Sequence, residues 1–249
     1  MTKRAGIQVC GLSFTYPGSQ RPVLDRLEFE VAAGERVALL GPNGSGKTTL
    51  ALHLNGLLTA QTGTIAFEGL TLAPGTLTQV RRRVGLVFQD PNDQLFMHSV
   101  RDDVAFGPAN LGFDMTEIEE RVDMALGAVS ATHLADSAPH HLSGGEKRRT
   151  AIATVLSMDP EILVLDEPTS GLDPLGRHEL ADLLNGLPQT QFIITHDLPF
   201  ALATCTRALV LDDARIAVDM ATESLLADPD LLAKHRLALP FGYRDPWSG

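Results

Sequence analysis

The sequence predicts an α/β fold with a mostly parallel sheet, and three observations support this prediction. Short apolar runs occur at 36–40, 84–88, 162–165 and 192–195, and such runs are typical of strands buried on both faces of a sheet. Helical patterns lie between these runs, which indicates strands that alternate with helices. Glycines follow the first run directly, as they do where the carboxyl edge of a sheet faces a ligand.

The first third of the chain is expected to contain mostly strands. The segments 7–16 and 27–31 alternate apolar with polar residues, which is typical of half-buried antiparallel strands. Around the run 36–40 we expect, in order, a helix at 50–58, an edge strand at 64–67, a basic helix around Arg81 and the strand 84–88.

The middle of the chain, 99–156, has a mainly helical pattern, and we expect it to form an inserted helical subdomain. Loop breaks are predicted at Pro108, Gly112, Pro139 and Gly144–Gly145. The elements expected after these are a strand at 162–165, a helix at 174–184, a strand at 192–195, a helix near 198–205, strands at 208–211 and 216–218, and short helices from Thr222. The end of the chain, 239–249, is expected to be loose.

Length and composition exclude several classes of protein. The chain has 249 residues, and 44% of them are hydrophobic, which argues against intrinsic disorder. It carries 20 Lys and Arg against 31 Asp and Glu, a net charge of −11. This balance argues against a general nucleic-acid binder, because phosphate neutralisation needs basic side chains.

Neither a membrane span nor a secretory signal is expected, since the sequence has no apolar stretch of about 18 residues and no apolar region near its start. Cys10 and Cys205 match no metal-ligand spacing and suit a reducing compartment. We therefore expect a soluble, intracellular protein.

A phosphate-binding loop is predicted directly after the run 36–40. Residues 41–48 read GPNGSGKT, which fits GxxxxGK followed by Thr, with a strand before it and a helix after it. Its glycines let backbone N–H groups approach phosphate oxygens closely, Lys47 is expected to reach the β- and γ-phosphates, and Thr48 is expected to bind Mg²⁺. The predicted nucleotide-binding residues here are Gly41, Pro42, Asn43, Gly44, Ser45, Gly46, Lys47, Thr48 and Thr49.

Two carboxylates follow the run 162–165. Asp166 and Glu167 would lie at the carboxyl edge of the sheet, where ligands bind in α/β folds. Asp166 suits a Mg²⁺ ligand and Glu167 a base that polarises the attacking water. Alone, the pair would be equally consistent with a solvated turn, and it is the phosphate loop that favours the catalytic interpretation.

A second anion site is predicted at Ser143, Gly144 and Gly145, within the segment LSGGE that opens a helix. Ser143 is a good N-cap, and the glycines leave the following amides accessible. One nucleotide cannot easily use both sites of one molecule. We therefore expect this site to serve the nucleotide of a partner subunit.

These segments resemble the motifs of the ATP-binding cassette (ABC) family over nearly the whole chain: GPNGSGKT resembles Walker A, ILVLDEP resembles Walker B, and LSGGE resembles the signature. The resemblance implies a P-loop NTPase in which a RecA-like core with an antiparallel β subdomain (1–88 and 157–220) carries an α-helical subdomain (89–156) and a short helical tail (221–249), all in a single ATPase domain. It implies ATP and Mg²⁺ as cofactors. It also implies a head-to-tail dimer, with either an identical or a related second ATPase subunit.

Four further residues match family motifs. Gln89 matches the Q-loop glutamine that reaches Mg²⁺, Asp173 belongs to the D-loop, His196 matches the switch histidine that contacts the γ-phosphate, and Tyr16 matches the aromatic residue that stacks on adenine. The signature has Glu146 where Gln is commoner, followed by Arg148–Arg149, and we expect little effect on phosphate binding. The seven other histidines are interpreted as surface or loop residues.

The segments 89–96 and 100–108 resemble energy-coupling factor or cobalt-type importer ATPases. In that group an acidic groove receives basic residues of a transmembrane coupling protein, and charged pairs of this kind are directional. The acids expected in the groove are Asp90, Asp93, Asp102 and Asp103, with Gln94 beside them.

This resemblance implies an ATPase at the cytoplasmic face of the plasma membrane that powers uptake of cobalt, nickel or a vitamin such as biotin. Its partners would be a transmembrane coupling protein and a substrate-binding membrane component. We expect it to bind no nucleic acid. Three alternatives remain open: an ATPase of another importer class, a soluble ABC protein that acts on nucleic acid, and a nucleotide-binding regulator that does not hydrolyse ATP. Acidity disfavours the second alternative, and the presence of Glu167 and His196 disfavours the third.

Overall fold

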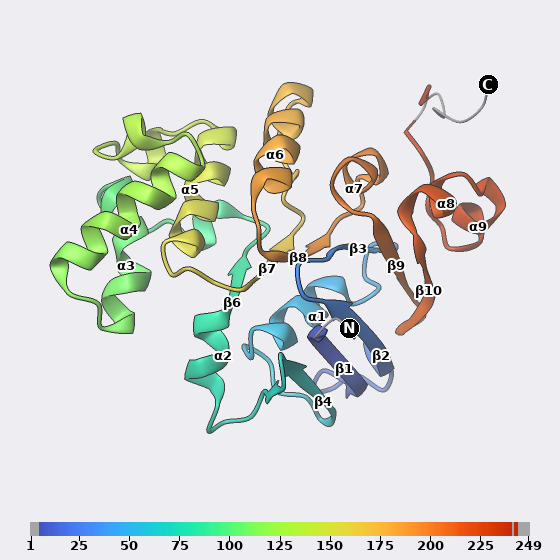
Figure 1. Cartoon of the computed structure of the whole chain (residues 1–249). Helices are drawn as coiled ribbons and strands as arrows, with labels where there is room; N and C mark the ends of the chain where they lie inside the picture. The colour runs from blue at the N-terminus through green and yellow to red at the C-terminus, as the bar shows by residue number, and fades with distance from the viewer. Residues whose placement is uncertain (1–4, 241, 244–249) are drawn as a thin grey trace.

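The computed structural model describes residues 5–240 and 242–243, and a six-stranded sheet forms its centre (Figure 1). The strand order is β10-β9-β3-β8-β7-β6. Four neighbouring pairs, β9 with β3, β3 with β8, β8 with β7 and β7 with β6, are parallel, and only β10 runs antiparallel to its neighbour. The strands are β3 (Arg36–Leu40), β6 (Val84–Val87), β7 (Ile162–Asp166), β8 (Thr190–Ile194), β9 (Arg207–Asp212) and β10 (Arg215–Ala221).

A second, antiparallel sheet lies below the first in Figure 1 and has the order β2-β1-β4-β5. Its strands are β1 (Ala5–Phe14), β2 (Leu24–Ala32), β4 (Thr62–Phe67) and β5 (Leu70–Thr71). Helix α1 (Lys47–Leu54) and helix α2 (Leu77–Arg83) connect the two sheets along the chain. The mostly parallel sheet and the antiparallel strands predicted from alternation are both confirmed.

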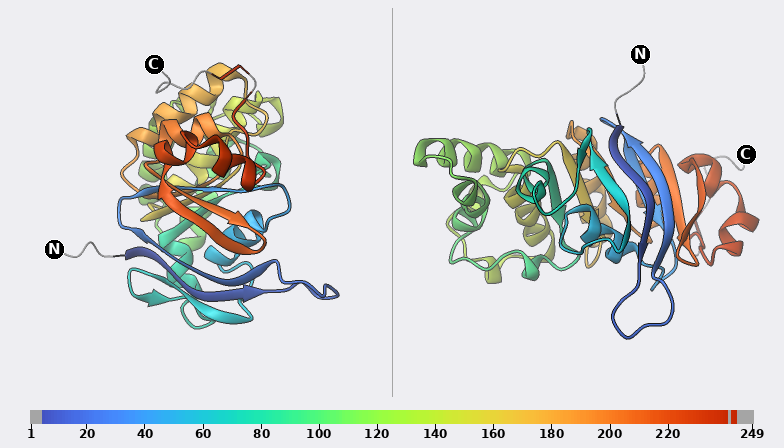
Figure 2. Two further views of the ribbon diagram at one scale, coloured as in Figure 1. Left: turned by 90° about the vertical axis from the view of Figure 1, so that its right-hand side faces the viewer. Right: turned by 90° about the horizontal axis from the view of Figure 1, so that it is seen from below.

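A helical region lies at one end of the molecule and the C-terminal helices lie at the other (Figures 1 and 2). The helical region contains η1 (Pro91–Asp93), α3 (Val100–Leu111), α4 (Met115–Ala128), η2 (Thr132–Leu134), η3 (Pro139–His141) and α5 (Gly144–Leu156). The remaining helices are α6 (Pro174–Gly186), α7 (Leu198–Thr204), α8 (Thr222–Leu226) and α9 (Pro229–Lys234). Within the described residues, no helix combines the length and apolar character needed to cross a membrane.

Alternate residues of β3 belong to different hydrophobic cores. Val37 and Leu39 pack with α1 and the antiparallel sheet, whereas Ala38 and Leu40 pack with the helices on the opposite face. All four side chains are fully buried, as expected for a strand covered on both faces. The six-stranded sheet is therefore a middle layer with a hydrophobic core on each face.

Two predicted loop breaks are wrong. Pro108 lies inside α3, where it removes the N–H that would bond the carbonyl of Val104. The buried hydroxyl of Ser157 donates to that carbonyl instead, at 2.8 Å. Gly144 and Gly145 form the first turn of α5, because Ser143 caps the helix immediately before them.

Other boundaries and environments also differ from expectation. The predicted bounds of the helix at 50–58 are wrong. Helix α1 begins at Lys47, because Gly46 caps it in a left-handed conformation with φ 105°, and it ends at Leu54. His53 and His235 are buried, so the surface interpretation of these two histidines is wrong. Of the segment 239–249 that we expected to be loose, residues 241 and 244–249 lie outside the described part of the chain.

Candidate nucleotide site

A cavity of about 580 Å³ opens where the carboxyl ends of the parallel strands meet. The phosphate loop follows β3, Gln89 follows β6, Glu167 follows β7 and His196 follows β8. The predicted residues that line this cavity are Tyr16, Asn43, Gly44, Gly46, Lys47, Thr48, Thr49, Gln89, Glu167 and His196. The parallel topology thus gathers side chains that are distant in the sequence.

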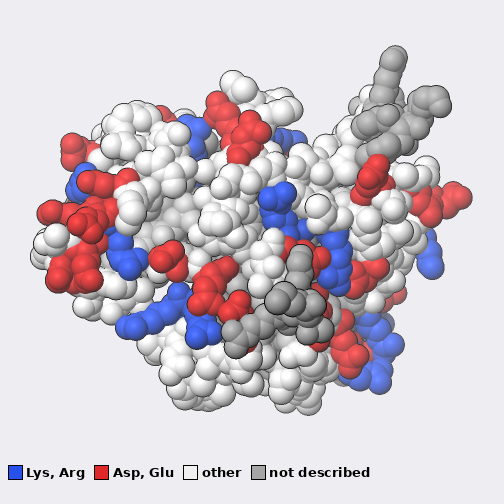
Figure 3. Space-filling view, in the orientation of Figure 1, with Lys and Arg blue, Asp and Glu red and all other residues white. Residues whose placement is uncertain are grey.

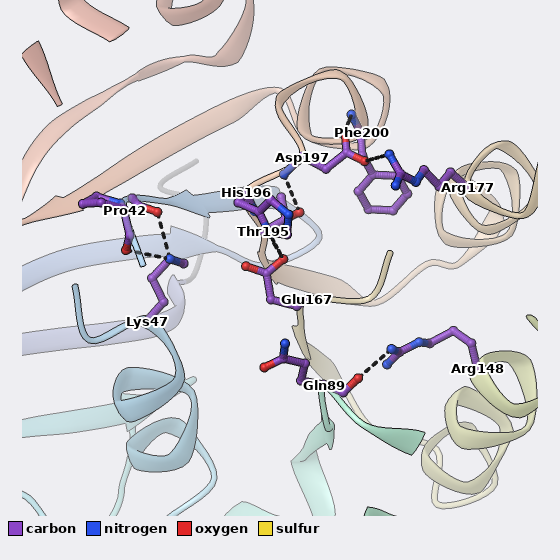
Figure 4. Close-up of polar contacts among 11 residues, drawn as sticks. Pro42, Lys47, Gln89, Arg148, Glu167, Arg177, Thr195, His196, Asp197 and Phe200 are labelled. Atoms are coloured by element: carbon purple, nitrogen blue, oxygen red, sulfur yellow. Dashed lines mark hydrogen bonds and ion pairs between the residues drawn. The ribbon is translucent and has the colours of Figure 1, made fainter. Parts of the chain in front are cut away.

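The phosphate loop packs tightly against its surroundings. A Cβ on Gly41 would lie 2.3 Å from the carbonyl oxygen of Leu211, and one on Gly46 would lie 2.8 Å from that of Val23. The ammonium of Lys47 donates to the carbonyls of Gly41 at 2.8 Å and Pro42 at 3.1 Å (Figure 4). Burial lowers the pKa of Lys47, and the nearby carboxylates Glu167 and Asp166 oppose that shift. The lysine is therefore held inside its own loop.

Asp166 is the last residue of β7 and is buried. Burial raises its pKa above the usual range, while a hydrogen bond from Thr48 acts in the opposite direction. Its Oδ1 atom is buried and has no hydrogen-bond partner among the described residues. A buried carboxylate oxygen beside a threonine hydroxyl fits a hard cation such as Mg²⁺.

Glu167 and His196 form a direct pair above this site. Nδ1 of His196 lies 2.8 Å from Oε2 of Glu167, and the backbone N–H of His196 donates to the same oxygen at 3.3 Å (Figure 4). Glu167 has a left-handed φ of 45°, and its own N–H donates to the carbonyl of Ile194 at the end of β8. Two neighbouring strands therefore orient this carboxylate toward the cavity.

The ring of Tyr16 lies at the wall of this cavity. Its hydroxyl is 3.1 Å from Oγ1 of Thr49, and its ring meets Phe14 edge-on with centroids 4.9 Å apart. The side chain remains 39% exposed. An aromatic face of this kind is available for stacking on a base.

Sequence reasoning missed Arg148, which holds the backbone at Gln89. Its guanidinium donates to the carbonyls of Phe88 at 2.8 Å and Gln89 at 2.7 Å, and the residue is only 1% exposed. The helical period offered a signal, because Arg148 lies three and four residues before the buried Ala151 and Ile152 and so shares their face.

Comparison with known proteins identifies the family. The model of the ABC transporter family matches residues 24–170. This chain belongs to the ABC transporter family. An ABC transporter ATP-binding protein of Streptomyces coelicolor is 57% identical over 98% of this chain and 93% of its own length. The energy-coupling factor transporter ATP-binding protein EcfA of Methanocaldococcus jannaschii is 43% identical over 94% of this chain and 85% of its own length.

Among solved structures, cbiO1 of Clostridium perfringens, part of the ABC transporter complex cbiONQ, superposes with a TM-score of 0.83. It is 37% identical, and the match covers 95% of this chain and 96% of that one. The predicted P-loop NTPase fold and the predicted ATPase class are therefore confirmed. An ABC ATPase binds a nucleotide, and the cavity described above is the candidate site.

The segment that resembles the ABC signature lies at the start of α5. Ser143 accepts from the N–H of Glu146 at 3.3 Å, while Oε2 of Glu146 accepts from the backbone N–H and the hydroxyl of Ser143 at 2.8 and 2.7 Å. These hydrogen bonds hold the pKa of Glu146 below its usual range. Ser143, Gly144 and Gly145 are not among the residues that line the described cavity.

The D-loop residue Asp173 caps α6. Its Oδ1 accepts from the N–H of Gly176 at 2.7 Å. A Cβ built on Gly144 would lie 3.7 Å from the carbonyl of Gly171, so the D-loop and the signature are neighbours in the fold. Both lie outside the described lining of the cavity.

A groove of about 470 Å³ lies between the Q-loop segment and α3, and Asp93, Gln94, Phe96, Asp103 and Phe106 are among the residues that line it. Phe96 and Phe106 are 60% and 43% exposed and meet edge-on at 5.0 Å. Asp103 differs from the other predicted acids because it is buried, and its Oδ1 accepts from the N–H groups of Phe96 and Met97.

The other three acids are on the surface. Asp90 caps η1 by accepting from Asn92, Asp102 accepts from Ser99 at 2.7 Å, and Asp93 lines the groove. Gln94 turns inward, where its amide donates to Ala151 and Thr154 of α5. Of the predicted groove acids, Asp93 is the one whose side chain is both exposed and at the groove.

Proposed function

We propose that this protein is the ATP-hydrolysing subunit of an energy-coupling factor type ABC importer. The structural observation that supports this most strongly is the groove beside the Q-loop, because Asp93 and the exposed rings of Phe96 and Phe106 line it. Likeness to EcfA, whose name describes an energy-coupling factor transporter, and to cbiO1 of the cbiONQ complex supports the same class.

The cavity has the groups that phosphoryl transfer requires. The backbone of the phosphate loop and Lys47 would hold the phosphates, with Asp166, Thr48 and Gln89 positioned to hold Mg²⁺. The metal would supply positive charge that neutralises the transferring phosphoryl group. Glu167 would accept a proton from the attacking water, and His196 holds the Glu167 carboxylate in place. Tyr16 would stack on adenine.

A second ATPase subunit would complete the site. Because Ser143, Gly144 and Gly145 lie outside the cavity of their own chain, their helix N-terminus is free to bind the nucleotide of another subunit. A head-to-tail dimer would place each signature, together with the D-loop residue Asp173, against the partner's phosphate loop. The second subunit could be identical or related.

The groove would receive a transmembrane coupling protein at the cytoplasmic face of the plasma membrane. Asp93 would pair with a basic side chain of that protein, and the exposed rings of Phe96 and Phe106 would pack against it. A substrate-binding membrane component would complete the importer. We infer that the cargo is a metal ion, cobalt or nickel, or a vitamin such as biotin.

Not all of the negative charge belongs to this surface. Acidic side chains gather over the helical region at the left of Figure 3, and α4 carries Glu117, Glu119, Glu120 and Asp123. We interpret that cluster as a solvated face that favours solubility. Glu119 is therefore a suitable control for changes made at the groove.

Charge reversal tests the proposed coupling. Asp93→Lys is expected to abolish co-purification with the membrane component, since a like charge at the groove repels a basic partner, while ATP binding stays within about twofold of wild type. The matched control is Glu119→Lys, which should leave co-purification unchanged. If Asp93→Lys still co-purifies, the groove is not the docking surface.

A further inference from the structure

Arg148 is a buried cation held by backbone carbonyls rather than by a carboxylate. It extends from α5, the signature helix, to the carbonyls of Phe88 at 2.8 Å and Gln89 at 2.7 Å. Figure 4 shows the contact with Gln89. Within the described residues it has no ion-pair partner within 4.0 Å. Burial lowers its pKa, and the more distant charges of Asp90 and Asp166 oppose that shift. Desolvating a guanidinium is costly, and its two terminal nitrogens are bound by these carbonyls, whereas its Nε is buried without a partner among the described residues.

Further contacts bind the same backbone segment, 88–94, to α5. Gln94 accepts from the N–H of Phe88 at 3.3 Å and donates to the carbonyl of Ala151 at 2.7 Å. Lys147 donates to Asn92 at 3.0 Å. Both ends of the segment are therefore bound by side chains or carbonyls of the signature helix.

The packing of α5 on β6 makes these contacts possible. A Cβ on Gly85 would lie 2.1 Å from Cγ1 of Val155, so only glycine allows the helix to approach the strand this closely. Gly85 is four residues before Gln89 on the same strand and loop. The distance between α5 and the start of the Q-loop is thus set by direct contact.

We propose that Arg148 is a positioning residue that fixes the backbone of Gln89 to the helix that carries Ser143, Gly144 and Gly145. Gln89 lines the nucleotide cavity of its own chain, whereas Ser143, Gly144 and Gly145 are not among the residues that line it. A shift of α5 therefore moves the Gln89 backbone with it. This inference rests on the proposed nucleotide site, and it adds a mechanical connection between that site and the signature of the same chain.

Arg148→Met tests this role, because methionine fills similar space without N–H donors and replacement of buried charge by an apolar side chain is often tolerated. We expect faster amide hydrogen exchange in 88–94 without nucleotide. We also expect ATPase turnover to fall about tenfold or more with KM changed less than about twofold, since a misplacement of about 1 Å can cost that much. Arg148→Lys should be intermediate, because one ammonium cannot replace a two-pronged donor.

A double-mutant cycle separates positioning from general destabilisation. In a Gln89→Ala background, Arg148→Met should change turnover less than about twofold, because the group that it positions is already absent. The matched control is Arg101→Met, since Arg101 is an exposed arginine of the same helical region that pairs with Asp123 at 3.0 Å. This control should leave exchange in 88–94 unchanged.

Equal effects of Arg148→Met in both backgrounds, or unchanged exchange in 88–94, would overturn the positioning role. Absence of ATPase activity in the wild-type protein would instead refute the proposed function. The exchange measurement needs no nucleotide, so it decides the positioning role in either case.

Discussion

At the scale of single residues, the candidate nucleotide site contains buried charged groups that bound ligands would stabilise. Asp166 is buried with a raised pKa, Lys47 is buried with a lowered pKa, and Oδ1 of Asp166 has no described partner. A carboxyl whose pKa is higher in the folded than in the unfolded state favours folding at low pH, and that contribution is lost as the pH rises through its folded-state pKa. The ionised carboxylate therefore lowers stability near neutral pH.

Asp166→Asn should for this reason stabilise the nucleotide-free protein while abolishing ATPase activity. We expect the thermal midpoint at pH 7 to rise, by roughly 2–4 °C for each kcal/mol of relieved desolvation, with the gain shrinking toward low pH. Added Mg²⁺ and ATP should stabilise wild type more than the variant. Differential scanning fluorimetry measures both effects, with the exposed Glu119→Gln as control. A lower midpoint in the variant would contradict this account.

At the scale of elements, the sequence predicted strands more accurately than helix ends. The bounds of β3 match the run 36–40, because a strand buried on both faces has an uninterrupted apolar pattern. The start of α1 was missed because Gly46, a poor helix former, begins the helix in a left-handed conformation that serves the phosphate loop. Pro108 was misplaced because the partner that compensates for it, Ser157, is 49 residues away in the sequence, and local patterns do not contain such contacts.

In helix α3, Ser157 supplies the hydrogen-bond donor that Pro108 lacks. The stabilities conferred by these two residues should therefore be coupled. Ser157→Ala leaves the buried carbonyl of Val104 without a donor and should cost about 1–3 kcal/mol in free energy of unfolding. Pro108→Ala restores the backbone N–H at that position, so the same serine change should cost clearly less in the Pro108→Ala background. Urea unfolding of the four proteins measures this coupling. Equal costs in both backgrounds would show that the hydroxyl does not replace the missing helical bond.

At the scale of the whole molecule, the carboxyl edge of one sheet explains why most candidate residues were found. Four strands deliver the phosphate loop, Gln89, Asp166–Glu167 and His196 to one edge, and parallel topology alone predicts that gathering. The sequence could not reveal that Asp103 is buried or that Arg148 reaches the Q-loop, because both depend on how the helical region packs on the sheet. Asp103 and Asp93 have the same side chain, but Asp103 is buried and Asp93 is exposed.

Because Ser143, Gly144 and Gly145 do not line the cavity of their own chain, we expect two subunits to share each nucleotide. Glu167→Gln keeps the shape of the side chain but removes the proton acceptor, so turnover should fall about 10²–10⁴-fold while ATP still binds. ATP would then persist between two subunits, and light scattering should show a dimer with ATP and Mg²⁺ but a monomer with ADP. Adding Lys47→Ala to this variant should abolish the dimer, because Lys47 lies within the phosphate loop. Wild-type turnover of Glu167→Gln would refute the role of the base, and a monomer at saturating ATP would refute the shared site.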